Sequence, residues 1–389
     1  MPPLTIDATY LTQTLSDLVS INSINPALSP DGPGEAQIGA YLSEAMRALG
    51  LQVSVDEVAS GRVNVIGQRA GRGAGRSLMW NAHMDTVGPN GMPQPFTPVI
   101  RDGRLYGRGS QDMKGSLAAM LAAVKALNQA QIELKGDLLL TAVADEEQGS
   151  LGSEHLVQHY HADAAIITEP TELGLALAHR GLAGFEVETF GRAAHGSRYQ
   201  DGIDAILLMG RFLVGLDALG QELIERPPHP LAGPPSLHAS IIHGGTEMST
   251  YPALCSLMIE RRTVPGETAE GIAQELQAIL DRCALAEARF RPRLKTLTYR
   301  PPFEVEPEAE IVQAVAGALQ ARSGQPPALR GAAYWTDAAI LADAGIPCVV
   351  IGPTGQGLHS AEEWVELESC VELAEILAQS AIHFCKEND

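Results

Sequence analysis

The 389-residue sequence is poor in positive charge and in cysteine and has no long apolar run, and each shortage excludes a class of protein. Its 27 Lys and Arg against 47 Asp and Glu give a formal net charge of −20, which argues against nucleic acid or an anionic membrane as a main partner. The five cysteines lack CxxC spacing, so neither a disulfide framework nor a cysteine zinc site is indicated. No segment offers about 18 uninterrupted apolar residues, and the start of the chain lacks the pattern of a signal peptide. We therefore expect a soluble, cytoplasmic protein.

The length of the chain and the order of its predicted elements indicate two domains. Up to about residue 180, strands such as SLMWNA and LLLTAVA alternate with helices, which is the rhythm of an α/β fold. Residues 181–300 instead follow the β-α-β-β-α-β order of ferredoxin-like domains. The first pattern then resumes. We predict an α/β domain formed by residues 1–180 and 301–389, with residues 181–300 inserted as a smaller α+β domain.

Side chains of the kind that bind metals follow several of the predicted strands. They come after SLMW, after DLLLTAVA, after AAIIT and in the loop after PCVVIGP, and they are His83, Asp85, Glu146, Glu147, Glu169 and His359. In open α/β sheets the loops beyond the carboxyl ends of the strands form the ligand crevice, so we expect these side chains to converge. The first hypothesis is a hydrolase with a metal centre.

Local context gives these residues separate parts. His83 and Asp85 would face the same side of a strand, where the carboxylate could orient the imidazole. Asp112 lies in a glycine-rich turn before a long helix, whose dipole and free amides favour an acid. Glu146 and Glu147 are adjacent and would point in different directions, one to a metal and one to the substrate water. Taken singly, each residue also fits a structural histidine, a helix N-terminal acid or a solvated strand end.

The set as a whole indicates catalysis. Two histidines and three carboxylates suit a pair of zinc-like cations that share one acid, and Glu146 then remains free as a general base. Structural zinc sites usually use cysteine and are closed, whereas this donor set would leave a position for water. Pro170 holds Glu169 extended at its strand end, and the glycines around His359 allow that loop to turn back towards a cavity.

Six segments hold these residues and further ones: NAHMDTV, GRGSQDMKG, ADEEQGSLGS, ITEP, GRAAHGS and GLHSAEEW. These segments resemble motifs of the M20 metallopeptidase family, and they occur in the same order as in that family, from about residue 80 to 365. The family includes acetylornithine deacetylase, succinyl-diaminopimelate desuccinylase, aminoacylase and glutamate carboxypeptidase. The resemblance implies a mixed-sheet zinc-hydrolase catalytic domain with an inserted lid domain, through which two subunits form a homodimer.

The resemblance also implies two zinc ions that share Asp112. The ligands it implies are His83, Asp112 and Glu169 for one zinc, and Glu147, His359 and Asp112 for the other. Asp85 would orient His83, and Glu146 would act as the acid and base. Cobalt suits the same ligands as zinc.

Substrate contacts follow from the resemblance as well. His195 in GRAAHGS matches a histidine that reaches the neighbouring subunit's site and stabilises the oxyanion. Arg262 in IERRTVPGE falls where family members keep an arginine for the substrate carboxylate, a fit for its planar fork, although a salt-bridged surface strand is the alternative. Two departures concern the substrate. Ser249 stands where many members have an asparagine, and Tyr334 and Trp335 occupy an otherwise glycine-rich stretch, where they would reshape the acyl or side-chain pocket.

We therefore predict a dimetal amidohydrolase that removes an acyl group from an N-acyl amino acid. Glu146 would take a proton from water and pass it to the leaving nitrogen. Glutamate at position 169 resembles the aminoacylase and carboxypeptidase branches, which favours this substrate class. Three alternatives stay open: a carboxypeptidase of the glutamate carboxypeptidase type acting on a short peptide, a dimetal phosphoesterase, and a non-catalytic binding protein on the same fold.

Overall fold

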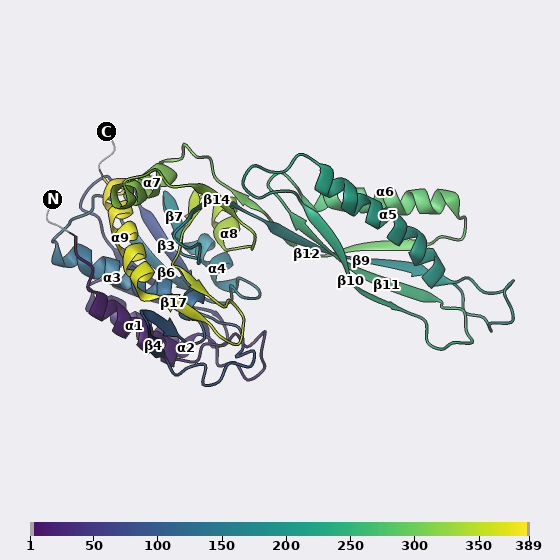
Figure 1. Ribbon diagram of the computed structural model, residues 1–389, viewed down its shortest axis with the longest axis horizontal. Helices are drawn as coiled ribbons and strands as arrows, with labels where there is room; N and C mark the ends of the chain where they lie inside the picture. Colours follow the sequence, from purple (N-terminus) through teal and green to yellow (C-terminus); the bar gives the residue numbers. More distant parts are fainter. Residues whose placement is uncertain (1–3, 387–389) are drawn as a thin grey trace. The chain divides into compact units, whose positions relative to one another are not determined.

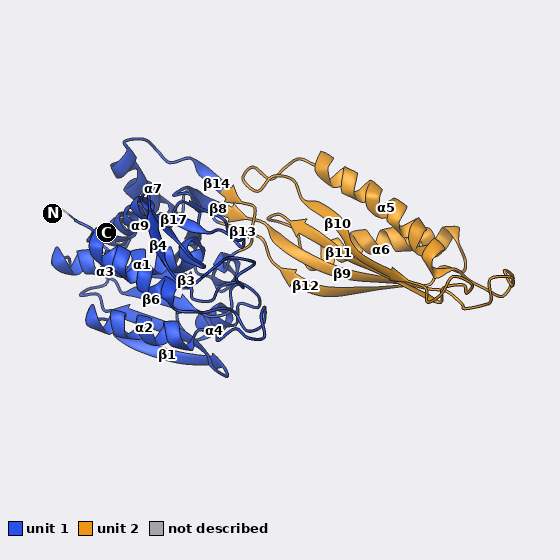
Figure 2. Ribbon diagram, turned by 60° about the horizontal axis from the view of Figure 1, so that its bottom comes forward, with its two compact units in different colours: residues 1–177, 305–330, 336–389 blue, residues 178–304, 331–335 orange. Residues whose placement is uncertain are grey.

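The computed structural model describes residues 4–386, and the chain divides into two compact units (Figure 2). Unit 1 contains Met1–Leu177, Val305–Arg330 and Thr336–Asp389, and unit 2 contains Ala178–Glu304 and Gly331–Trp335. Unit 2 is thus inserted in unit 1, and the short stretch 331–335 belongs to it as well. Within the described residues, no helix combines the length and apolar character that crossing a membrane requires.

Unit 1 is built around a mixed β-sheet. Its helices are α1 (Ala8–Ser20), α2 (Ala36–Ala48), α3 (Gly115–Gln129), α4 (Leu151–His159), α7 (Glu310–Ser323), α8 (Ala338–Asp343) and α9 (Leu367–Phe384), and the π-helical segment η1 (Ser110–Lys114) precedes α3. The strands of the large sheet are β1 (Gln52–Ala59), β2 (Arg62–Arg69), β3 (Leu78–His83), β6 (Leu138–Val143), β7 (Ala164–Ile167) and β15 (Cys348–Val350). A small separate sheet contains β4 (Val99–Arg101), β5 (Arg104–Tyr106), β16 (Gly355–Gln356) and β17 (Trp364–Glu366).

The order of the large sheet brings four parallel strands together at its centre, β6, β3, β7 and β15. The order is β1-β2-β6-β3-β7-β15, continued by β8 (Leu175–His179), where the chain passes from unit 1 to unit 2. β3 is parallel to β6 and to β7, with His83 opposite Val143 and Asn81 opposite Ile167. These three strands are buried along their whole length, as expected of strands covered on both faces. The predicted α/β class with a mixed sheet is confirmed.

Helices cover both faces of this sheet (Figure 1). Gly39 of α2 lies against the side chains of Val63 and Val65, whereas Gly152 of α4 lies against the side chain of Asn64. Because successive side chains of a strand point to opposite faces, α2 and α4 lie on opposite sides of β2. Helix α3 is apolar and buried on nearly every side, and α1 and α9 pack against it.

Unit 2 is an antiparallel sheet with two helices. Its elements are β9 (Gly181–Phe190), α5 (Ala205–Glu225), β10 (Ser236–Gly244), β11 (Leu254–Thr263), α6 (Ala269–Ala286) and β12 (Pro292–Arg300), and the strand order is β10-β11-β9-β12. Alternate residues of β9, among them Phe185 and Val187, form a core with Phe212 of α5 and Leu276 of α6. This element order fits the predicted ferredoxin-like domain. The two remaining strands, β13 (Phe303–Glu304) and β14 (Leu329–Ala332), each pair with β8 of the large sheet.

Candidate metal centre

Parallel strands deliver most of the candidate ligands to one edge of the large sheet. His83 is the last residue of β3, Glu146 and Glu147 follow the end of β6, and Glu169 lies two residues beyond β7. Since β6 and β7 both pair with β3 in parallel, these three strand ends are neighbours. The predicted convergence at the carboxyl ends of the strands is therefore present in the structure.

Asp112 stands between the two candidate histidines. It lies in η1 directly before α3, and His359 lies in the loop between β16 and β17, with a left-handed φ of 59°. Asp112 Oδ1 is 2.9 Å from His83 Nε2, and Asp112 Oδ2 is 3.4 Å from His359 Nε2. One carboxylate thus faces both imidazoles, which is the arrangement expected of an acid shared by two cations.

The remaining carboxylates lie beside these histidines. Glu169 Oε1 is 3.6 Å from His83 Nε2, and Glu147 Oε2 is 2.9 Å from His359 Nε2. Two groups of three residues each have their ligand atoms within 4.8 Å of one another. The first group is His83, Asp112 and Glu147, and the second is His83, Glu146 and Glu169. Imidazole nitrogens and carboxylate oxygens without thiolate suit an open, zinc-type catalytic site. The residues present therefore fit a metal centre.

The cluster favours positive charge. Hydrogen bonds to Asp112 and Glu147 raise the pKa of His359 to about 10. Burial opposes a charge on His83, but the carboxylates of Asp112 and Glu169 raise its pKa well above the usual value. Metal ligands must lose their protons to bind, so a cation and these protons compete for the same electron pairs. The carboxylates therefore favour positive charge at both imidazoles.

Glu146 binds a proton more tightly than an ordinary glutamate does. Burial raises its pKa well above the usual range, and the neighbouring Glu169 carboxylate raises it further. A carboxylate with a raised pKa accepts a proton more readily at neutral pH, which is the property that base catalysis needs.

Asp85 holds the turn that carries Glu146. The nearest partner of His83 Nδ1 is the backbone carbonyl oxygen of Asp85, at 2.9 Å, and the Asp85 carboxylate is 3.6 Å away. That carboxylate instead accepts hydrogen bonds from the backbone N–H groups of Glu146 and Glu147, at 3.1 and 3.3 Å. The backbone of Asp85 thus orients the imidazole, and its side chain orients the turn.

A buried polar network behind this turn was not predicted. Asn25 Nδ2 donates to Asp85 Oδ2 at 2.7 Å and to Asp145 Oδ1 at 2.9 Å. Arg62 donates to the same Asp145 oxygen at 3.0 Å and pairs with both carboxylate oxygens of Glu35. Asp145 itself has a left-handed φ of 72°. The network connects the segment before α2 with the turn after β6.

Two further candidates lie on adjoining loops of unit 2. His195 is exposed, and its Nδ1 lies 2.8 Å from Ser197 Oγ. The Ser249 carbonyl accepts a hydrogen bond from Gly196 N at 2.7 Å, so the loops that carry His195 and Ser249 are joined. Within the described residues, the hydrogen bonds of the His195 ring involve Nδ1 and not Nε2.

The two neighbouring arginines of β11 differ in their surroundings. Arg261 is buried and is ion-paired with Glu267 and Glu275. The Arg262 side chain is 38% exposed and lies 2.7 Å from Glu260. Arg262 is the more exposed of the two, and its Nε is ion-paired with Glu260, as in the salt-bridged surface strand that was the alternative.

Tyr334 and Trp335 lie in the stretch 331–335, which belongs to unit 2. Trp335 Nε1 donates to the Pro301 carbonyl at 3.0 Å, and the Arg300 guanidinium lies 4.9 Å from the centre of the Trp335 ring. The indole is therefore held by packing and hydrogen bonding inside unit 2.

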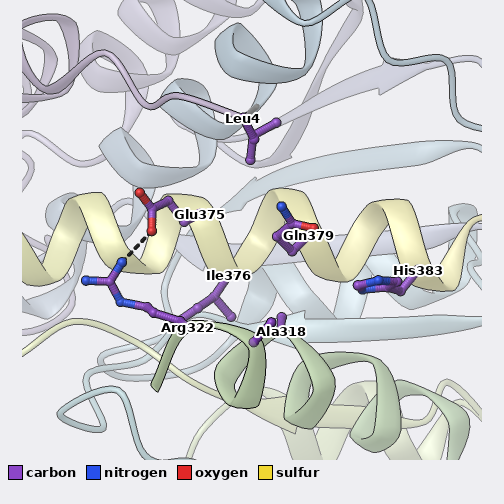
Figure 3. Close-up of a pocket in the computed structure, with 8 residues that line it drawn as sticks. Leu4, Ala318, Arg322, Glu375, Ile376, Gln379 and His383 are labelled. Carbon is purple, nitrogen blue, oxygen red and sulfur yellow. Dashed lines mark hydrogen bonds and ion pairs between the residues drawn. The ribbon is translucent and has the colours of Figure 1, made fainter. Parts of the chain in front are cut away.

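A cavity of about 520 Å³ lies elsewhere in unit 1, along α7 and α9 (Figure 3). Arg322 of α7 reaches across it to Glu375 of α9, and Gln379 and His383 of α9 also line it. No candidate metal ligand lines this cavity within the described residues. The chemistry of the metal centre does not extend to it.

Comparison with known proteins decides the family. The model of peptidase family M20/M25/M40 matches residues 79–383. The chain belongs to this family. The matched range contains every candidate metal ligand of this M20 protein, and the resemblance read from the sequence is confirmed.

Relatives of this M20 protein include a deacetylase and a deformylase. An acetylornithine deacetylase of Myxococcus xanthus is 30% identical over 385 residues, which cover 96% of this chain and 97% of that protein. An N-formyl-4-amino-5-aminomethyl-2-methylpyrimidine deformylase of Bacillus subtilis is 28% identical over 406 residues, which cover 96% of this chain and 94% of that protein. The crystal structure of aminopeptidase PepT from Bacillus cereus is similar to this structure with a TM-score of 0.82 at 20% sequence identity, and the match covers 98% of this chain and 100% of that chain. The prediction of a metallohydrolase acting on amide bonds is confirmed at the level of the family.

Proposed function

We propose that this M20 protein is a dimetal amidohydrolase that removes the acyl group from an N-acyl amino acid. The observation that carries the proposal is the position of Asp112, which faces His83 with one oxygen and His359 with the other. The similarity to an acetylornithine deacetylase over nearly the whole chain supports the substrate class.

Each cation would have three protein ligands. The ligand sets are His83, Asp112 and Glu169 for one cation, and Glu147, His359 and Asp112 for the other. Zinc is the cation we propose, and cobalt suits the same donors. When bound, the cations would polarise the amide carbonyl and make water a better acid.

Glu146 would act as the general base and acid. Its raised pKa lets it accept a proton from water and then return that proton to the leaving amine nitrogen. The hydrogen bond from Glu146 N to Asp85 Oδ1 holds the backbone of this residue in place. The products would be a carboxylate and a free amine.

Unit 2 would supply the substrate contacts. His195 would donate a hydrogen bond to the oxyanion of the tetrahedral intermediate in a neighbouring subunit. Arg262 would bind the substrate carboxylate through its guanidinium, which is partly exposed and is paired with Glu260 at its Nε. Ser249, on the loop joined to that of His195, and Tyr334 with Trp335 would shape the pocket for the acyl group or the side chain.

We also propose a homodimer formed through unit 2. Strand β10 is at the edge of its sheet, and edge strands offer unpaired backbone groups to another chain. Ile241 and Ile242 on β10 and Leu207 and Val214 on α5 are exposed apolar side chains, of the kind that a subunit interface would cover. Light scattering should give twice the chain mass of 41.2 kDa. Ile242→Lys should lower it to the monomer value, and a monomeric wild type would contradict the dimer.

The catalytic proposal is tested with a substrate panel. N-acetyl-, N-succinyl- and N-carbamoyl-amino acids, dipeptides and a phosphate ester are incubated with the protein and zinc or cobalt, and a chelator serves as the control. Chelator-sensitive release from acyl-amino acids is the expected result and identifies the preferred side chain. Activity on dipeptides alone would move the assignment to a peptidase, and phosphate-ester hydrolysis alone to a phosphoesterase. No activity at all would favour a binding protein.

A further inference from the structure

Arg108 and Glu363 form a buried ion pair beside Asp112. Arg108 Nη1 lies 2.6 Å from Glu363 Oε2, and each side chain is 1% exposed. Strand pairing brings the two residues together, because Trp364 of β17 lies opposite Tyr106 of β5. Arg108 and Glu363 lie just outside these paired positions and therefore become neighbours, although they are 255 places apart in the chain.

The Glu363 carboxylate holds the backbone of the turn that carries Asp112. Its Oε2 accepts a hydrogen bond from Gly109 N at 2.9 Å, and its Oε1 accepts from Gln111 N at 2.9 Å and from Asp112 N at 3.1 Å. Both oxygens are thus engaged by backbone donors, and one of them also by Arg108. Glu363 is committed to contacts within the protein and is not available as a metal ligand.

Arg108 connects the same turn to the loop of His359. Its Nη2 donates to the Ser360 carbonyl at 2.7 Å, and its Nε donates to the Gly88 carbonyl at 3.0 Å. The segment that contains Gly88 is also bonded directly to the loop of His359, because Asn90 Nδ2 donates to the His359 carbonyl at 2.9 Å. One guanidinium therefore holds three chain segments in register at the metal centre.

We propose that Arg108 and Glu363 are positioning residues for the cation bound by Glu147, His359 and the shared Asp112. This inference rests on the dimetal site proposed above. Two of the three ligands of that cation depend on the ion pair, Asp112 through the N–H groups of its turn and His359 through the adjoining loop. A fixed backbone keeps ligand atoms in place for the cation, so less ordering is needed when it binds.

The other cation depends less on this pair. Only one of its three ligands, the shared Asp112, lies on the turn held by the ion pair. The other two are positioned by the parallel pairing of the large sheet, because His83 is the final residue of β3 and Glu169 follows β7. Loss of the ion pair should therefore weaken the two cation sites unequally.

The test is a calorimetric titration of metal-free protein with Zn²⁺. Glu363→Gln keeps the side-chain shape but removes the charge and replaces one acceptor oxygen with an NH₂ donor. Glu366→Gln is the matched control, because Glu366 lies on β17, the strand that Glu363 directly precedes, and the side chain of Glu366, ion-paired with Arg104 at 3.9 Å, is 40% exposed. We expect Glu363→Gln to keep one tight zinc and to bind the second roughly 10- to 100-fold more weakly, with the control equal to wild type.

The outcomes are distinguishable. Wild-type binding of two zinc ions by Glu363→Gln would overturn the inference, and so would equal weakening of both sites. A wild-type protein that binds fewer than two ions would overturn the proposed dimetal function instead. Arg108→Lys is titrated in parallel in case Glu363→Gln does not fold by circular dichroism. It keeps the positive charge but loses the fork that reaches the carbonyl groups, so it must show the same loss at one site.

Discussion

The side-chain amide of Asn25 donates a 2.7 Å hydrogen bond to the Asp85 carboxylate, 60 positions further along the chain. The second amide hydrogen goes to Asp145 at 2.9 Å, so both hydrogens of the NH₂ group are used. The other Asp85 oxygen accepts from Glu146 N. The orientation of the proposed general base is thus connected to the N-terminal segment of the chain.

Asn25→Ala should therefore lower kcat by about 10- to 100-fold, because the carboxylate that holds the Glu146 turn loses its donor. KM should change little, since Asn25 is buried away from solvent. The control is Asn22→Ala, because Asn22 Oδ1 accepts only a local hydrogen bond from Ile24 N within the same segment. Steady-state kinetics on the preferred acyl-amino acid check this. Equal kcat values for the two variants would contradict the role of Asn25.

Glu146→Ala should lower kcat by about 10³-fold, the scale of general acid–base catalysis. The metal content, measured by elemental analysis after gel filtration, should stay close to that of wild type because the five proposed ligands remain. Normal turnover would exclude Glu146 as the base. Loss of metal together with activity would instead make it a ligand, a possibility that its closeness to His83 and Glu169 raises.

His359→Ala should lower the metal content, because one of the two proposed sites loses its only imidazole. His383→Ala is the control, since His383 lies on α9 and lines the separate cavity along α7 and α9 (Figure 3). Elemental analysis of both variants, purified with excess zinc, measures the change. Full occupancy and full activity in His359→Ala would exclude this residue as a ligand.

Zinc affinity should rise with pH up to about 10, the raised pKa of His359 in the metal-free protein. A proton bound at His359 must leave before the cation binds, so higher pH removes a competitor. The same shift has the opposite effect on folding. A folded pKa above the ordinary value of about 6.5 stabilises the metal-free protein below that pH, and this contribution is lost as pH rises through 10. Zinc titration and thermal unfolding in chelator, each from pH 6 to 10, should give opposite trends, and parallel trends would contradict the assignment.

The site ligands at strand ends could be predicted because buried strands are visible as apolar runs and parallel strands end at one edge of a sheet. His83, Glu147 and Glu169 all follow such runs. The expected contact between Asp85 and the His83 ring differs from the one found. Strand β3 ends at His83, so the alternation that would place the two side chains on one side does not extend to Asp85.

The residues that orient the ligands carried no comparable signal. Asn25, Arg62 and Glu363 are polar residues that follow no periodic pattern, and these partners lie 27 to 255 positions away. Burial of a charge is decided by its distant partner, which a single sequence does not reveal. The order of helices and strands in unit 2 could be predicted for the opposite reason. Each element is amphipathic, so its apolar positions repeat with a period that is visible within a short stretch of sequence.

Arg62→Met should destabilise the protein by about 3–5 kcal/mol, because it leaves buried carboxylates without their cation. Glu35 and Asp145 are the two partners, and the Arg62 side chain is only 8% exposed. Arg72→Met is the control, since its ion pair with Glu133 is largely exposed and should matter little. Urea unfolding in the presence of chelator measures both variants without a contribution from bound metal.

The destabilisation by Arg62→Met should also depend on pH. Burial already raises the pKa of Glu35, and the hydrogen bond from Arg62 opposes that rise. Without the arginine, the folded variant binds a proton at Glu35 more tightly than the unfolded chain does, so its stability falls as pH increases. The difference from wild type should therefore be larger at pH 8 than at pH 5. A difference that is the same at both values would mean that the loss comes from packing of the Arg62 side chain rather than from the uncompensated carboxylate.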